Sequence, residues 1–161
     1  MTNTYNSSNL LCLDFDGVIH AYTTPWQGAD KIPDPSVPGA IEWLLQAFKR
    51  GYDIAIFSAR SSQPGGIPAM RYWLKKELIL WLNKDRTLKD QIKITELADY
   101  KPQSDDRQYE VALWADGIVN KVVWCTTKLP SKLYIDDNAH RFEGTWPSFD
   151  EVDKMESWVK E

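Results

Sequence analysis

The chain has 161 residues, of which 43% are hydrophobic and 26% are charged, and its formal net charge is −4. These values are typical of a single globular domain with a sizeable core, and the negative charge gives no reason to expect strong binding to a nucleic-acid backbone. Cys12 and Cys125 lie in apolar runs, so we expect reduced core cysteines and no disulfide framework. Without a signal segment or a membrane-spanning stretch, the predicted location is cytoplasmic.

The first predicted element is a buried strand over residues 10–13, which follows a polar segment over residues 1–9 that we expect to be a flexible tail. The strand is continuously apolar, as central strands of parallel sheets are. It ends in Asp14-Phe15-Asp16-Gly17-Val18, at the position where open α/β sheets bind ligands. Two ionised carboxylates at such a place need a partner, and a hard cation would supply one.

A helix and a second strand are predicted next. Residues 19–37 are polar and rich in proline, and Pro38 suits the first turn of a helix. The helix has its apolar residues at helical spacing and Gly51 at its end. The second strand covers residues 53–57 and ends at Ser58. This strand–helix–strand order favours a parallel sheet.

The rest of the chain continues as helices and strands. We expect helices over residues 68–83 and 107–115 and strands over 119–126 and 132–135. Gly117 should end the second of these helices, and residues 84–100 are ambiguous, with a possible short strand around residues 92–94 followed by a helical turn. Ser148 and Glu151 form a capping box for a last helix. Its predicted inward face contains Val152, Met155 and Trp158 or Val159.

Acidic residues end two of the predicted strands. Asp136 and Asp137 follow the fourth strand directly, as Asp14 and Asp16 follow the first. Parallel strands bring their carboxyl ends to one edge of a sheet, where these oxygens would suit Mg²⁺. The two histidines, His20 and His140, flank the acidic motifs, and a supporting or surface role fits them better than catalysis.

The ordered motifs resemble those of the haloacid dehalogenase (HAD) superfamily of phosphatases and phosphotransferases. The resemblance covers residues 10–142 and is carried by Asp14-Phe15-Asp16-Gly17-Val18, Ser58, Lys128 and Asp136-Asp137. It implies an α/β fold of three layers, Rossmann-like, with a mainly parallel sheet and helices on both faces. The possible insertion points are too short for a large cap domain, so we expect a single catalytic domain over residues 10–161, capless or minimally capped.

The resemblance implies a Mg²⁺-dependent phosphohydrolase that forms an aspartyl-phosphate. Asp14 would be the nucleophile and Asp16 the general acid and base. Mg²⁺ would bind the side chain of Asp14, the backbone carbonyl of Asp16, and Asp136, with Asp137 ligating directly or through water. Phe15 should point away from the site, since alternate residues of an extended segment share a side.

Four residues are candidates for substrate binding. Ser58 would donate to a phosphoryl oxygen and Lys128 would neutralise the transferred group, with Lys132 as the rival lysine. Arg60 could bind a second anionic group, and Trp26 could stack on a base or sugar. Three of them have a plainer interpretation: a helix cap or turn hydroxyl for Ser58, a solvated loop arginine for Arg60 and a core residue for Trp26.

Other functions are compatible with part of this pattern. A phosphotransferase would use the same residues, and a non-catalytic metal- or phosphate-binding module would not need Asp16. A signalling receiver domain has its acids in the other order, and a two-metal nuclease finds no support in a basic surface. The expected substrate is a phosphorylated small molecule, a nucleotide or a nucleic-acid end, with no membrane association and no obligate protein partner.

Overall fold

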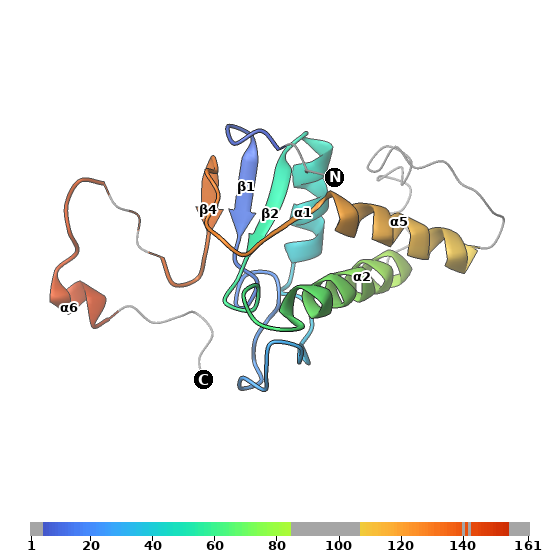
Figure 1. Cartoon of the computed structure of the whole chain (residues 1–161), viewed down its shortest axis with the longest axis horizontal. Helices are drawn as coiled ribbons and strands as arrows, with labels where there is room; N and C mark the ends of the chain where they lie inside the picture. Colours follow the sequence, from blue (N-terminus) through green and yellow to red (C-terminus); the bar gives the residue numbers. More distant parts are fainter. Residues whose placement is uncertain (1–4, 85–106, 140, 142, 155–161) are drawn as a thin grey trace.

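The computed structural model describes residues 5–84, 107–139, 141 and 143–154. Its centre is a four-stranded parallel sheet in the order β3-β2-β1-β4 (Figure 1). The strands are β1 (Leu10–Leu13), β2 (Asp53–Phe57), β3 (Val123–Cys125) and β4 (Leu133–Ile135). The chain is therefore an α/β protein, and the predicted bounds of β1 and β2 are confirmed.

Three long helices pack on one face of the sheet. They are α1 (Ala40–Lys49), α2 (Gly66–Lys84) and α5 (Arg107–Lys121). One hydrophobic cluster joins their buried residues to Leu11 and Leu13 of β1 and to Ile54 and Ile56 of β2. These strand residues alternate along their strands, so they lie on one face of the sheet.

The opposite face has a smaller cluster. It contains Leu10 and Cys12 of β1, Ala55 of β2 and Cys125 of β3, with Tyr5 and four other partly buried residues against it. Both cysteines are free and buried, as predicted. Within the residues that the structure describes, no helix belongs to this cluster, so the predicted helices on both faces are seen on one face only.

The start of the described chain is attached to the sheet. The backbone N–H of Asn6 donates to the Asp53 carboxylate at 3.2 Å, and Tyr5 packs against the smaller cluster. Of the predicted tail, residues 1–4 lie outside the described residues. The contacts of Tyr5 and Asn6 fix residues 5–9 beside the beginning of β2.

Helix α5 is longer than predicted. It continues through Gly117 to Lys121, so the predicted end at Gly117 is wrong, and β3 begins at Val123 rather than at residue 119. The buried residues of this stretch recur at helical spacing: Val111, Trp114, Ala115, Ile118, Val119 and Val122. This burial outweighs the cost of one glycine within a helix, which is about 1 kcal/mol.

The last described helix, α6 (Phe149–Val152), is short and exposed. The predicted capping box is present: Ser148 Oγ accepts from the backbone N–H of Glu151, whose carboxylate accepts from the N–H of Ser148. Val152 is 43% exposed, so its predicted inward position is wrong. Figure 1 shows α6 well apart from the sheet. The other predicted inward residues and nearly all of the ambiguous segment 84–100 lie outside the described residues.

No helix within the described residues is both long enough and apolar enough to cross a lipid bilayer.

Candidate functional site

The carboxyl ends of three strands meet at one edge of the sheet. Strand β1 lies between β2 and β4, so the residues that follow these strands, Asp14, Ser58 and Asp136, are neighbours at that edge. The backbone N–H of Asp14 donates to the carbonyl of Ile135 at 2.9 Å. This bond extends the pairing of β1 with β4 by one residue and fixes the first acidic motif beside the second.

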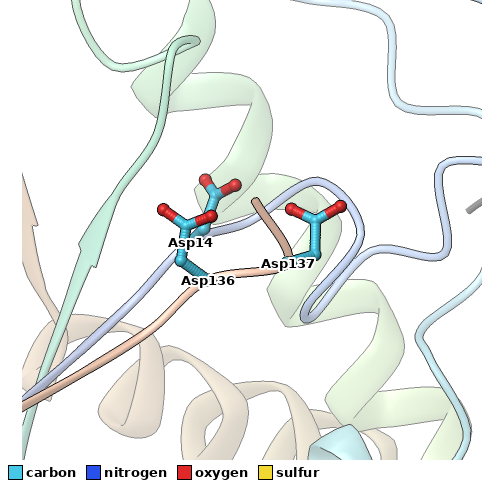
Figure 2. A group of neighbouring side chains, drawn as sticks. All are labelled: Asp14, Asp136 and Asp137. Carbon is cyan, nitrogen blue, oxygen red and sulfur yellow. The ribbon is translucent and has the colours of Figure 1, made fainter. Parts of the chain in front are cut away.

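Three carboxylates form an acidic cluster at this edge. Asp14, Asp136 and Asp137 each place one carboxylate oxygen within 4.8 Å of the others (Figure 2). Asp14 and Asp137 are half-buried, whereas Asp136 is exposed. The structure thus brings together the three carboxylates that were predicted to ligate a metal through their side chains, and they could hold a hard cation.

The charge of the cluster is poorly compensated at Asp14. Burial raises the pKa of this carboxyl, and the nearby charges of Asp136, Asp16 and Asp137 raise it further. A hydrogen bond from the backbone N–H of Phe15, at 2.7 Å, opposes the shift, yet the pKa still rises from 3.8 to about 7. A bound cation would relieve the repulsion and favour the ionised form.

Gly17 permits the approach of the two acidic motifs. Its φ of +81° is in the left-handed region, and a Cβ atom here would lie 2.6 Å from Oδ2 of Asp137. Any side chain at position 17 would therefore meet the carboxylate of the cluster. This contact explains why glycine follows the first acidic motif.

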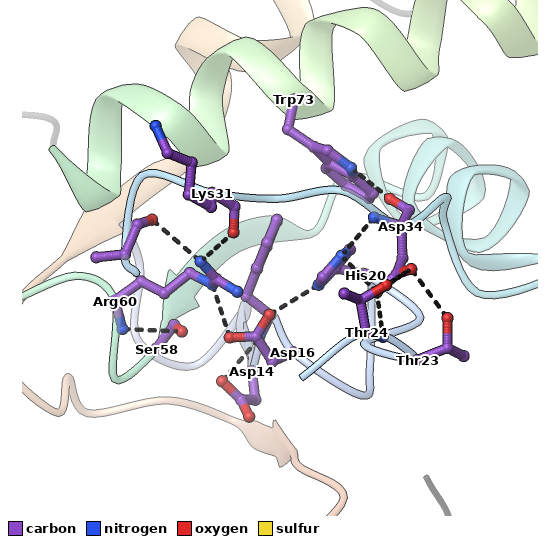
Figure 3. Close-up of polar contacts among 12 residues, drawn as sticks. Asp14, Asp16, His20, Thr23, Thr24, Lys31, Asp34, Ser58, Arg60 and Trp73 are labelled. Atoms are coloured by element: carbon purple, nitrogen blue, oxygen red, sulfur yellow. Dashed lines mark hydrogen bonds and ion pairs between the residues drawn. The ribbon is translucent and has the colours of Figure 1, made fainter. Parts of the chain in front are cut away.

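Asp16 has different surroundings from Asp14. Its Oδ2 accepts from Nε of Arg60 at 2.7 Å, and its Oδ1 lies 2.8 Å from Nδ1 of His20 (Figure 3). Burial raises the pKa of Asp16, but the hydrogen bonds and charges of His20 and Arg60 outweigh it and hold the pKa below its ordinary value. Its carboxylate is thus absent from the acidic cluster and belongs to a separate network.

Arg60 is not a solvated loop residue, and its predicted binding of a second anionic group stays a prediction. Its side chain is only 1% exposed, and Nη1 donates to the carbonyls of Gly28, Ala29 and Lys31 at 2.9 to 3.1 Å. Its Cζ lies 4.5 Å from the ring centroid of Trp26. Nε and Nη1 of the guanidinium are therefore occupied by groups of the protein itself.

His20 is fully buried and supports Asp16 from the other side. Its Nε2 accepts from the backbone N–H of Asp34 at 3.3 Å, which leaves Nδ1 as the donor to Asp16. Its ring stacks on Phe15 and meets the edge of Trp73. The predicted supporting role of His20 agrees with this placement, while His140 lies outside the described residues.

Asp34 was not singled out in the sequence. Its carboxylate accepts from the hydroxyl groups of Thr23 and Thr24 and from the backbone N–H of Thr24, at 2.7 to 2.9 Å. Its carbonyl accepts from Nε1 of Trp73 on α2. Burial raises the pKa of Asp34, but the hydrogen bonds from Thr24 and Thr23 outweigh this and lower it. No local pattern in the sequence links these residues, because the loop must fold before they meet.

The remaining predicted residues occupy distinct positions. Ser58 is buried beyond β2, and its Oγ accepts from the backbone N–H of Arg60 at 3.3 Å. Lys128 is exposed, with Nζ 4.7 Å from the ring centroid of Tyr134. Trp26 is 44% exposed, so it is not a core residue. Phe15 is fully buried and packs against Trp73, and it therefore points away from the acidic cluster as predicted.

Comparisons with known proteins do not assign the chain to a family. No protein-family profile matches it, and neither a curated protein nor a solved structure matches it.

Proposed function

We propose that the chain is a Mg²⁺-dependent phosphohydrolase of the HAD type that cleaves a phosphomonoester through an aspartyl-phosphate on Asp14. The observation that carries the proposal is the acidic cluster of Asp14, Asp136 and Asp137, whose oxygens lie within 4.8 Å of one another at the carboxyl edge of a parallel sheet. The order of the motifs along the chain supports the HAD type and, with it, a Rossmann-like arrangement of the sheet.

The donor set of the cluster fits a hard divalent cation. All three groups offer carboxylate oxygens, the ligand type that Mg²⁺ prefers. Burial and, after it, the nearby charges of Asp136, Asp16 and Asp137 raise the pKa of Asp14, and a bound cation would offset both effects. When bound, Mg²⁺ would supply charge neutralisation for the phosphoryl oxygens and for the nucleophile. Asp14, Asp136 and Asp137 would hold it, together with the backbone carbonyl of Asp16.

The chemistry divides into two displacements. In the first, a carboxylate oxygen of Asp14 bonds to phosphorus, the bond from phosphorus to the leaving oxygen breaks, and Asp16 donates a proton to that oxygen. In the second, water gives its proton to Asp16 and bonds to phosphorus. The acyl phosphate bond then breaks, which releases inorganic phosphate and restores the carboxylate of Asp14.

Asp16 is suited to receive and return this proton. Arg60 and His20 keep it ionised in the ligand-free protein, which is the form that a general base needs. A phosphate dianion beside it would raise its pKa, because a second negative charge disfavours the carboxylate. Proton uptake by Asp16 would therefore accompany substrate binding.

Ser58 and Lys128 are proposed to bind the phosphoryl group. The Ser58 oxygen accepts a bond from Arg60 N–H, which leaves its hydroxyl proton to donate to a phosphoryl oxygen. Lys128 lies over the ring of Tyr134, a weak contact for an exposed lysine. Its flexible side chain can leave that contact for a bound anion.

The proposal is tested by phosphate release from a panel of phosphomonoesters, with Mg²⁺ or with EDTA. The panel contains nucleotides, sugar phosphates and oligonucleotides phosphorylated at either end. Asp14→Asn and Asp136→Asn should abolish release, whereas Asp150→Asn, a matched change in exposed α6, should leave it intact. Silence of the natural protein across the panel, while calorimetry shows Mg²⁺ binding, would favour a phosphotransferase lacking its acceptor or a binding module.

A further inference from the structure

We propose that Arg60 is a positioning residue for Asp16. Through Arg60, the orientation of the Asp16 carboxylate depends on the conformation of the loop over residues 26–31, and the conformation of the loop depends on Asp16. The catalytic part of this inference rests on the proposed function. The observation behind it is that one buried guanidinium contacts Asp16 through Nε and three loop carbonyls through Nη1.

The two edges of the guanidinium serve different partners. Nε points to Oδ2 of Asp16 at 2.7 Å, while Nη1 donates to Gly28, Ala29 and Lys31. Because the group is planar and rigid, a shift of the loop would turn the nitrogen that faces Asp16. A lysine has one compact ammonium and could not hold both sets of partners.

The loop also covers one face of the Arg60 guanidinium, through the ring of Trp26. The ring of Trp26 lies 4.5 Å from Cζ, a distance suited to a cation–π contact. Trp26 is itself 44% exposed, so it forms an outer cover over a buried charge. The loop and Arg60 therefore hold each other in place.

The backbone of Arg60 is fixed in the turn that follows β2. Its N–H donates to Ser58 Oγ at 3.3 Å, and its carbonyl accepts from the N–H of Gln63 at 3.0 Å. Gly66 at the start of α2 lies so close that an added Cβ would be 1.9 Å from this carbonyl oxygen. The side chain thus extends from a rigid base toward Asp16.

The carboxylate of Asp16 is held from two sides. Arg60 binds Oδ2 and His20 binds Oδ1, so the plane of the carboxylate is defined by two donors from different segments. Removing Arg60 would leave one donor and allow the plane to rotate. Proton transfer depends on such alignment, so the loss should appear in the step that protonates the leaving oxygen.

The first test compares leaving groups. The natural protein, Asp16→Asn, Arg60→Met and the double variant are assayed on 4-nitrophenyl phosphate, whose leaving group needs little protonation, and on glycerol phosphate, whose leaving group needs it. We expect Arg60→Met to lower kcat on glycerol phosphate about tenfold more than on 4-nitrophenyl phosphate. KM should change less than kcat, and the double variant should lose no more than Asp16→Asn alone.

Equal losses on the two substrates, or losses that multiply in the double variant, would overturn the positioning role. Arg71→Met is the matched control, since Arg71 also lies over a tryptophan ring, that of Trp124, and donates to Asn120 on α5. It should leave the leaving-group ratio unchanged. Where Arg60→Met fails to fold, Arg60→Lys keeps the charge but loses the planar fork, and it should show the same ratio in weaker form.

The second test does not depend on activity. Hydrogen exchange of the peptide covering residues 26–31 should speed up about tenfold or more in both Arg60→Met and Asp16→Asn, and Arg71→Met should leave it unchanged. Silence of the natural protein on every substrate would remove the proposed function alone. Unchanged exchange in the two variants would remove the link between the loop and Asp16, whatever the activity.

Discussion

Asp14 and Asp16 lie two residues apart, yet the protein surrounds them in opposite ways. Asp14 faces Asp136 and Asp137 across the pairing of β1 with β4, and its pKa rises to about 7. Asp16 faces Arg60 and His20, and its pKa falls. The comparison shows that two carboxyls separated by one residue can have opposite surroundings when the chain stops being extended between them, as it does at the bend at Phe15.

The largest expected effect is on the Asp14 side. Asp14→Asn removes the proposed nucleophile, and hydrolysis should fall by about 1,000-fold or more. Steady-state phosphate release measures this. Asp16→Asn should retain more activity on 4-nitrophenyl phosphate than Asp14→Asn does, and equal losses on that substrate would erase the distinction between the two acids.

A pH effect on stability should follow from Asp14. Because its pKa is raised from 3.8 to about 7 in the folded protein, folding favours its protonated form. The contribution to stability is therefore fully present below about pH 4 and is lost as the pH rises to about 7, by at most about 4 kcal/mol. Urea unfolding of the metal-free protein at several pH values measures it.

Asp14→Asn should remove this pH-dependent loss, and near pH 8 the variant should be more stable than the natural protein without metal. Mg²⁺ should stabilise the natural protein more near pH 8 than near pH 5, because binding needs the ionised carboxylate. A variant that is less stable than the natural protein near pH 8 would contradict the raised pKa of Asp14.

A substitution at Gly17 tests the contact between the first acidic motif and Asp137 of the acidic cluster. Gly17→Ala should cost about 2 to 3 kcal/mol in unfolding free energy, since both the left-handed φ and the contact with Asp137 oppose a side chain. Gly39→Ala is the matched control: its φ is +82°, with nothing within 4 Å of the added atom. The control should cost about 1 kcal/mol and leave Mg²⁺ affinity unchanged, and equal costs would argue against the contact.

The smallest effect on the free energy of unfolding is expected for Trp26, whose ring covers Arg60 beside Asp16. Trp26→Leu removes the ring from the Arg60 guanidinium and should cost about 0.5 to 1 kcal/mol, measured by urea unfolding. Mg²⁺ affinity should not change, because the acidic cluster is untouched. A loss of Mg²⁺ binding in this variant would mean that the two regions are not separate.

Local patterns were enough to predict much of the sheet. The apolar runs gave β1, β2 and the end of β4 where the structure has them, and the parallel pairing places Asp14 beside Asp136 and Asp137. The end of α5 was missed, because burial of Ile118 and Val119 extends the helix past Gly117. An isolated glycine carries no information about the packing that overrides it.

The network around Asp16 could not be predicted in the same way. Arg60 follows β2 and its partners come from a loop about thirty residues earlier, so no spacing within the sequence joins them. The burial of Asp34 among threonine hydroxyls is equally a product of the folded loop. Polar contacts between distant loops depend on tertiary structure, whereas strand ends are marked in the sequence itself.

The short pairing of β4 with β1 has a consequence for local unfolding. Strand β4 has three residues and pairs with β1 at one end of the described sheet, where opening requires few broken bonds. If β4 detaches, Asp136 and Asp137 leave Asp14 and the acidic cluster ceases to exist. A bound cation would therefore stabilise the pairing of β4 with β1, so that a higher cation affinity and a longer lifetime of this pairing would go together.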